Sequence, residues 1–178
     1  MKTRILIRCQ PGDIIVELDE GKAPKTCANF IAYMQAGAYE ETSFFRIVTP
    51  QHNMDDPERQ IAVIQGGPKF NLKGHDPNLS LFHLDHEPTT ETGISHNDGT
   101  ISMGRFAPGE TYGGFFFCIG KQPALDYGGA RFPDKLGAAA FGKVAEGLDI
   151  LYQIYNKADS SEFLANEIPI FTVVPLNN

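Results

Sequence analysis

The beginning of the chain alternates between apolar and polar positions. Residues 4–9 (RILIRC) carry an apolar residue at every second position, and the alternation resumes in residues 14–18 (IIVEL). A Pro-Gly-Asp sequence at residues 11–13 separates the two runs and is typical of a turn. Side chains two residues apart share one face of a strand, so the pattern predicts a β-hairpin.

Two later segments repeat their apolar residues at helical spacing. The first helix is predicted over residues 25–36, with Pro24 near its first turn and Gly37 just past its end. The second is predicted within residues 146–156 (EGLDILYQIYN). The apolar positions that carry this pattern are Cys27, Phe30, Ile31, Met34, Leu148, Leu151, Ile154 and Tyr155.

The rest of the chain consists of short apolar runs between turn-rich segments. Strands are predicted at residues 42–48, 61–65, 100–104, 115–119, 138–144 and 168–176, with one more short strand near Leu79–Leu84. The intervening loops include residues 50–60 and a Gly-rich stretch at 120–137. Because strands and helices do not alternate regularly, the pattern favours an antiparallel barrel or sandwich with two capping helices. An unrelated α+β sandwich remains an alternative at this point.

Composition narrows the class of protein. A chain of 178 residues with 42% hydrophobic residues fits one domain, residues 1–178. Its net charge of −7 and the lack of any long basic run argue against nucleic acid or a membrane as partners. The three cysteines form no CxxC pair, and the start of the chain has no signal-peptide pattern. We therefore expect a cytoplasmic protein.

Five segments, taken in order, resemble the cyclophilins, a family of peptidyl-prolyl cis-trans isomerases. They are residues 12–48 (GDIIVEL to SFFRIV), VIQGG (63–67), GTISMGR (99–105), FFFCIG (115–120) and FGKVAEGLDIL (141–151). The resemblance implies a mainly β fold, a closed eight-stranded antiparallel β-barrel capped by two α-helices. It also implies isomerisation of Xaa-Pro bonds in protein folding, with proline-containing peptides or unfolded protein clients as partners. We expect a monomer that needs no cofactor and no metal.

The resemblance also assigns roles to individual residues. Arg46 is expected to be the catalytic arginine, and Gln65 the residue that orients it. The proline pocket and the rest of the substrate site are expected to be formed by Phe117, Val63, Leu125, Phe115, Ala62 and Arg105. Strand periodicity predicts that Phe44 shares a face with Arg46, Val63 with Gln65, and Phe115 with Phe117, while Phe116 lies in the barrel core.

The chain also departs from the family pattern. Cyclophilins usually have an aromatic residue at Ala62 and at Ala124, Gln at Phe115, Asn at Arg105, and His or Tyr at Ala138. The loss of pocket aromatics predicts reduced activity, unless Phe115 and Phe116 fill the space. Two insertions, residues 50–60 and 68–86, are expected to be surface loops, with a gating role as the alternative.

Other chemistries have weaker support in the sequence. Four histidines could supply metal ligands, but their spacing along the chain does not match that of a metal site. They are His75, His83, His86 and His96. No GxSxG motif indicates a serine hydrolase, and Gly113-Gly114 and Gly128-Gly129 lack the context of a phosphate-binding loop. The main alternative to an isomerase is a proline-peptide binding module on the same barrel, with weak or no catalysis.

Overall fold

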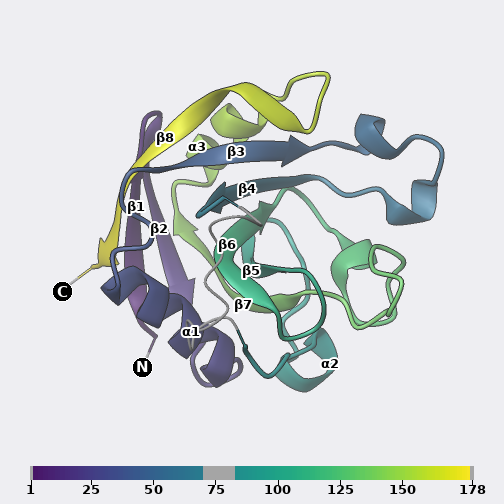
Figure 1. The fold of residues 1–178 in the computed structure, drawn as a ribbon, viewed down its shortest axis with the longest axis horizontal. Coiled ribbons are helices and arrows are strands. Elements are labelled where there is room, and N and C mark those ends of the chain that lie inside the picture. The colour runs from purple at the N-terminus through teal and green to yellow at the C-terminus, as the bar shows by residue number, and fades with distance from the viewer. Residues whose placement is uncertain (1, 70–82, 177–178) are drawn as a thin grey trace.

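A computed structural model describes residues 2–69 and 83–176 of the chain. The strands are β1 (Arg4–Cys9), β2 (Gly12–Leu18), β3 (Thr42–Val48), β4 (Val63–Gly67), β5 (Thr100–Arg105), β6 (Thr111–Cys118), β7 (Ala139–Glu146) and β8 (Phe163–Pro175). Within the described residues, these eight strands close into a barrel in the order β1-β2-β7-β5-β6-β4-β3-β8 (Figure 1). All neighbouring strands are antiparallel. The predicted barrel is confirmed, and the α+β sandwich is wrong.

Three α-helices accompany the barrel in the part of the chain that the structure describes. They are α1 (Pro24–Gln35), α2 (Thr89–Thr92) and α3 (Leu148–Tyr155). The first and last agree with the predicted helices, and their buried apolar side chains belong to the same core as the barrel interior. The single turn α2 was not predicted, because four residues are too few to show a helical period. None of the described helices is long and apolar enough to cross a membrane.

Strand β6 begins four residues before the predicted start, because Gly113 and Gly114 continue the strand instead of forming a loop. A Cβ atom on Gly114 would lie 2.3 Å from Cε2 of Tyr112. A Cβ atom on Gly104, in the neighbouring strand β5, would lie 2.8 Å from the Tyr112 hydroxyl. The two glycines therefore leave room for the Tyr112 side chain to lie against the strands, which matters for the site described below.

A β-bulge in β3 separates Phe44 from Arg46. The register of β3 shifts between these two residues in its pairing with both β4 and β8. Phe44 is fully buried in the barrel core, whereas Arg46 is partly exposed on the outer face. The prediction that they share a face is wrong, because one extra residue in a bulge reverses the faces of the residues beyond it.

Strands β4 and β6 carry apolar side chains on both faces. Their inward side chains join the barrel core, and their outward side chains join a second apolar cluster outside it. The second cluster consists of Val48, Ile61, Val63, Phe116, Cys118, Ala124, Leu125 and Ala138, with Phe132 packed against it. A barrel wall that is buried on both sides provides a rigid floor for a surface pocket.

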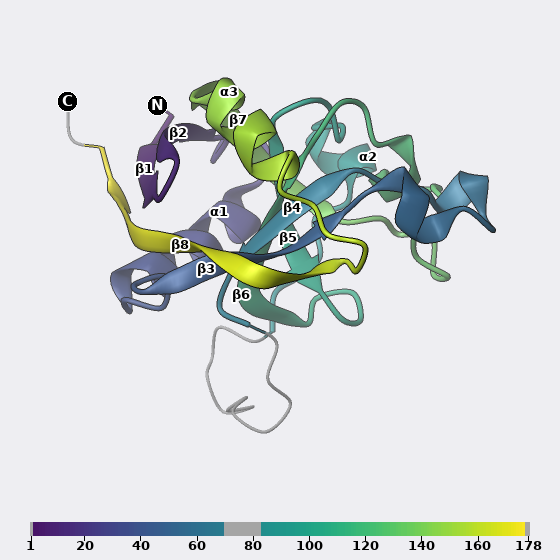
Figure 2. The same ribbon diagram turned by 90° about the horizontal axis from the view of Figure 1, so that it is seen from above.

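The insertion at residues 50–60 forms two short 3-10 turns, η1 (Pro50–Asn53) and η2 (Pro57–Arg59). The turns lie beside the segment that joins β6 to β7, as Figures 1 and 2 show. Arg59 Nη2 donates to the carbonyl oxygen of Arg131 in that segment at 3.3 Å, and Arg131 Nη1 donates to the carbonyl oxygen of Arg59 at 3.3 Å. The insertion is thus joined to a second loop instead of standing free in solvent.

The second insertion, residues 68–86, lies largely outside the described residues, and so does most of the short strand predicted near Leu79–Leu84. Within the described part, His83 forms an isolated β-bridge with Glu110.

Candidate active site

A pocket of about 130 Å³ lies over the second apolar cluster. Its apolar lining is formed by Ile61, Val63, Phe116, Leu125 and Phe132. Its other lining residues are Arg46, Gln65, Gly104, Arg105, Tyr112 and Arg131. Pockets for drug-sized ligands are typically about 300–1,000 Å³, so this one suits a single small apolar side chain.

Arg46 stands at this pocket in a fixed orientation. Its Nε and Nη2 atoms donate to Oε2 of Glu162 at 2.9 and 2.6 Å, and Nη1 donates to Oε1 of Gln65 at 3.0 Å. A guanidinium group has five N–H bonds, and these contacts use three of them. Two N–H bonds therefore remain without a partner among the described residues, on a charged group held at the pocket.

Gln65 is oriented by its neighbours across the sheet. It pairs with Arg46 in β3 and with Phe116 in β6, so all three side chains emerge on the outer face. The Gln65 amide donates through Nε2 to the Tyr112 hydroxyl while its oxygen accepts from Arg46. Burial raises the pKa of Tyr112, although the Arg46 charge opposes this shift, so the phenol stays neutral.

Arg105 reaches the pocket from β5, but its donors are engaged within the protein. Its Nη1 and Nη2 atoms donate to the two carboxylate oxygens of Asp134 at 3.0 and 2.9 Å, and Nε donates to the carbonyl oxygen of Gly137 at 2.9 Å. Its Cζ atom lies 3.8 Å from the centroid of the Phe132 ring. Arg105 thus holds the loop between β6 and β7 against the barrel, and with it the Phe132 wall of the pocket.

Some of the residues that the sequence proposed for the site line the pocket, and the others lie in the barrel core. Arg46, Val63, Gln65, Arg105 and Leu125 line the pocket. Ala62, Phe115 and Phe117 belong instead to the barrel core.

The reason for this difference in β6 is its register with β4. Phe117 pairs with the inward Ile64, whereas Phe116 pairs with the outward Gln65. The aromatic residue at the pocket is therefore Phe116, and its predicted place in the core is wrong, as is the predicted groove position of Phe115 and Phe117. Three consecutive phenylalanines carry no polar residue to mark the outer face, so the sequence did not reveal the register.

Comparison with known proteins identifies the family of this barrel. Residues 4–174 match the family described as cyclophilin type peptidyl-prolyl cis-trans isomerase/CLD. The chain belongs to this family. Membership confirms the resemblance drawn from the five sequence segments, and with it the predicted enzyme class, peptidyl-prolyl isomerase.

Bacterial cyclophilins are among its relatives. The chain is 28% identical over 167 residues to peptidyl-prolyl cis-trans isomerase cyp18 of Streptomyces antibioticus, which covers 92% of this chain and 89% of the relative. It is 26% identical over 162 residues to peptidyl-prolyl cis-trans isomerase B of Escherichia coli, with 89% and 87% covered. The crystal structure of a cyclophilin type isomerase of Cryptosporidium parvum superposes with a TM-score of 0.78 at 23% identity, over 100% of this chain and 99% of that one. That likeness shows the shared fold.

The sequence predicts that the pocket lacks aromatic residues that cyclophilins usually have. Phe132, from another part of the chain, supplies an aromatic ring at the same cluster. Ala124 and Ala138, where the family usually carries larger side chains, both belong to the second cluster, and Phe132 packs against that cluster. Phe132 comes from the Gly-rich loop between β6 and β7, so its position relative to the strands was not predictable from a strand pattern.

Sequence reasoning missed several residues at this site. They are Ile61, Tyr112, Arg131, Phe132 and Glu162. The one available signal was the dipeptide of glycines after Tyr112, which indicates a close approach of a side chain to the strand.

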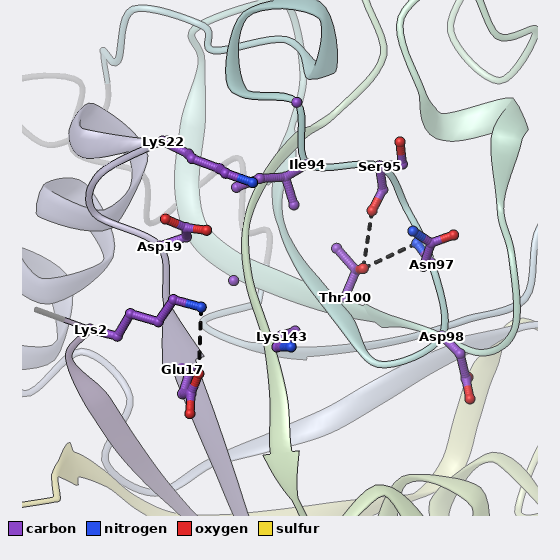
Figure 3. A pocket seen from close by; sticks show the side chains of 12 residues that line it. Lys2, Glu17, Asp19, Lys22, Ile94, Ser95, Asn97, Asp98, Thr100 and Lys143 are labelled. Atoms are coloured by element: carbon purple, nitrogen blue, oxygen red, sulfur yellow. Dashed lines mark hydrogen bonds and ion pairs between the residues drawn. The ribbon is translucent and has the colours of Figure 1, made fainter.

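A larger polar groove of about 290 Å³ lies between β2, β7 and the segment before β5 (Figure 3). Opposite charges are mixed along it, and Lys2 Nζ lies 3.7 Å from Oε2 of Glu17. Thr100 Oγ1 donates to the carbonyl oxygen of Ser95 at 3.2 Å and accepts from the backbone N–H of Asn97 at 3.1 Å. Most of its lining residues are polar or charged, with Ile94 as the one large apolar side chain among them.

Metal and nucleophile chemistry have no support at the described residues. Within residues 2–69 and 83–176, no group of three His, Cys, Asp or Glu side chains is placed to hold a metal ion. The buried His96 instead lies 2.7 Å from Asp126 Oδ1 and 3.0 Å from the Ser102 hydroxyl. Burial raises the pKa of the Cys118 thiol, beneath the pocket, far above its usual value, so no thiolate forms there. His75 lies outside the described residues.

Proposed function

We propose that this chain speeds the cis-trans exchange of Xaa-Pro bonds by stabilising the twisted amide with Arg46, and that its clients are folding polypeptides. The barrier to this exchange is about 20 kcal/mol, because the amide C–N bond has partial double-bond character. In the twisted amide, the prolyl nitrogen regains a lone pair. A guanidinium N–H aimed at that lone pair binds the twisted state better than the planar one and so lowers the barrier.

The observation that carries the proposal is the fixed guanidinium beside an apolar pocket. Glu162 and Gln65 hold Arg46 through three N–H bonds, and two remain for a substrate. Arginine suits this role because its charge persists at every physiological pH. Electrostatic stabilisation of this kind needs no nucleophile, metal or cofactor.

The pocket floor suits the proline ring. Val63, Phe116 and Leu125 supply apolar surface next to Arg46 and Gln65. A ring held there leaves the residue before proline free to rotate about the amide bond. The Cryptosporidium parvum relative has been crystallised in the presence of the dipeptide Ala-Pro, which supports proline-containing peptides as ligands of this chain.

The test is exchange spectroscopy by NMR on a short blocked peptide containing Ala-Pro. With catalytic amounts of wild-type protein, we expect the cis and trans signals to exchange at least tenfold faster than in buffer. Arg46→Ala is expected to lose most of this acceleration. A matched control is Lys143→Ala, which removes a cation from the distant polar groove and leaves the acceleration intact.

The same measurement separates the isomerase from a binding module on the same barrel. A module binds the peptide, seen as chemical-shift changes at the pocket, without exchanging its two forms. If both wild type and Arg46→Ala bind the peptide but leave its exchange at the uncatalysed rate, the proposed catalysis is rejected.

A further inference from the structure

The arginines at the pocket differ in their charge partners. Arg46 is paired with Glu162 at 2.6 Å, and Arg105 is paired with Asp134 at 2.9 Å. Arg131 lines the same pocket, but it has no carboxylate within 4 Å in the part of the chain that the structure describes. It is therefore the arginine at the pocket whose charge is not compensated by an adjacent acid.

Arg131 is nevertheless held in a defined place. Its backbone N–H donates to the carbonyl oxygen of Ala124 at 3.0 Å, and its Nη1 donates to the carbonyl oxygen of Arg59. Arg59 returns a hydrogen bond to the Arg131 carbonyl oxygen, and it also has no carboxylate partner among the described residues. Arg131 at the pocket and the exposed Arg59 beside it are thus two cations from different loops that are held together by reciprocal hydrogen bonds.

The surroundings of Arg131 favour an anion. Burial, with the positive charges of Arg46 and Arg59, lowers its pKa despite the opposing charge of Glu162. The cation is therefore less well solvated than one on the open surface, and an approaching carboxylate relieves this cost. The chain as a whole carries a net charge of −7, so attraction of an anion to Arg131 has to come from the neighbouring arginines and not from the overall field of the protein.

We propose that Arg131, supported by Arg59, is a specificity-determining residue that binds an acidic side chain adjacent to the proline of the client. The inference rests on the proposed function and adds its substrate class. Guanidinium and carboxylate groups match as paired hydrogen-bonding partners, which makes an Asp or Glu side chain the ligand chemistry that fits. The insertion that carries Arg59 then contributes to substrate choice.

The test compares matched peptides blocked at both ends, so that only a side chain supplies a carboxylate. One pair carries Glu or Gln before the proline, and a second pair carries Glu or Gln after it. We expect kcat/KM from NMR exchange at low salt to be five- to tenfold higher for Glu than for Gln in at least one pair. In Arg131→Gln this ratio is expected to fall to near one, and Arg131→Lys is expected to retain part of it.

Controls separate a local contact from the overall field and from loss of folding. Lys143→Gln removes the same charge from the distant polar groove and is expected to keep the wild-type ratio. Urea unfolding of each variant shows that it is folded. Equal kcat/KM for Glu and Gln peptides in wild type, or a ratio that survives in Arg131→Gln, would overturn the inference and leave the isomerase standing. No acceleration of any peptide would overturn both.

Discussion

Oε2 of Glu162 accepts two hydrogen bonds from Arg46, one from Nε at 2.9 Å and one from Nη2 at 2.6 Å. Both side chains are about one quarter exposed, so the pair is only partly protected from water. Glu162 comes directly before β8, and its carboxylate fixes the Arg46 guanidinium at the pocket with two N–H bonds left for a substrate. Glu162 is therefore a positioning residue for the proposed catalytic arginine.

The first prediction is that Glu162→Gln lowers kcat more than it raises KM. The amide keeps an acceptor but loses the charge, and a partly exposed pair of this kind is worth about 1 kcal/mol. We expect kcat to fall about fivefold, since 1.36 kcal/mol corresponds to a factor of ten. Full kinetics on one Ala-Pro peptide check this, with Glu17→Gln in the polar groove as the matched control. An unchanged kcat would show that Arg46 does not need Glu162.

The second prediction separates two neighbouring phenylalanines in β6. Phe117 is fully buried in the barrel core, and Phe116 lines the pocket. We expect Phe117→Leu to lower the free energy of unfolding by about 1–2 kcal/mol with kcat/KM little changed. Phe116→Leu is expected to do the reverse, reducing kcat/KM severalfold at a smaller cost in stability. Urea unfolding and exchange kinetics on both variants check this pair, and identical profiles for the two would contradict the placement.

The contrast between these residues also shows where sequence reasoning succeeds. The hairpin and both main helices followed from period and turn chemistry, because each depends on residues close together in the chain. The pattern alone left a barrel or a sandwich open, and the closed eight-stranded barrel was reached through the family resemblance. The pairing of Arg46 with Gln65 was reached through the family resemblance. The bulge before Arg46 was not, because it shows only in the pairing of β3 with its neighbouring strands. The register of Phe116 was not either, because the three phenylalanines have no polar residue among them to mark the outer face. Phe132 and Arg131 come from a loop, whose path no periodicity describes.

The third prediction concerns the loop wall of the pocket. Phe132→Ala removes the ring that Arg105 covers and one apolar side of the pocket. We expect the free energy of unfolding to fall by about 1–2 kcal/mol and KM to rise several-fold, because both a cation-π contact and buried apolar area are lost.

The matched control for this change is Phe171→Ala. Phe171 lies in β8 and is 52% exposed, so the same truncation there removes little buried surface. Unfolding and KM measured on both variants test the role of the loop. If Phe171→Ala raised KM as much as Phe132→Ala, the effect would not come from the pocket.

The fourth prediction is a fall in stability below neutral pH that depends on His86. Burial lowers the pKa of His86 from its usual value of 6.5, even though Nε2 donates to the carbonyl oxygen of Leu136 at 3.2 Å and so favours the protonated form. The unfolded chain therefore binds a proton at a higher pH than the folded one. As pH falls below 6.5 the unfolded state gains stability first, so the free energy of unfolding decreases until the folded histidine also titrates. His86→Gln keeps a donor for Leu136 without this titration, and urea unfolding at pH 7.5 and 5.5 is expected to show a smaller loss in the variant. An equal loss in both proteins would assign the pH dependence to other groups.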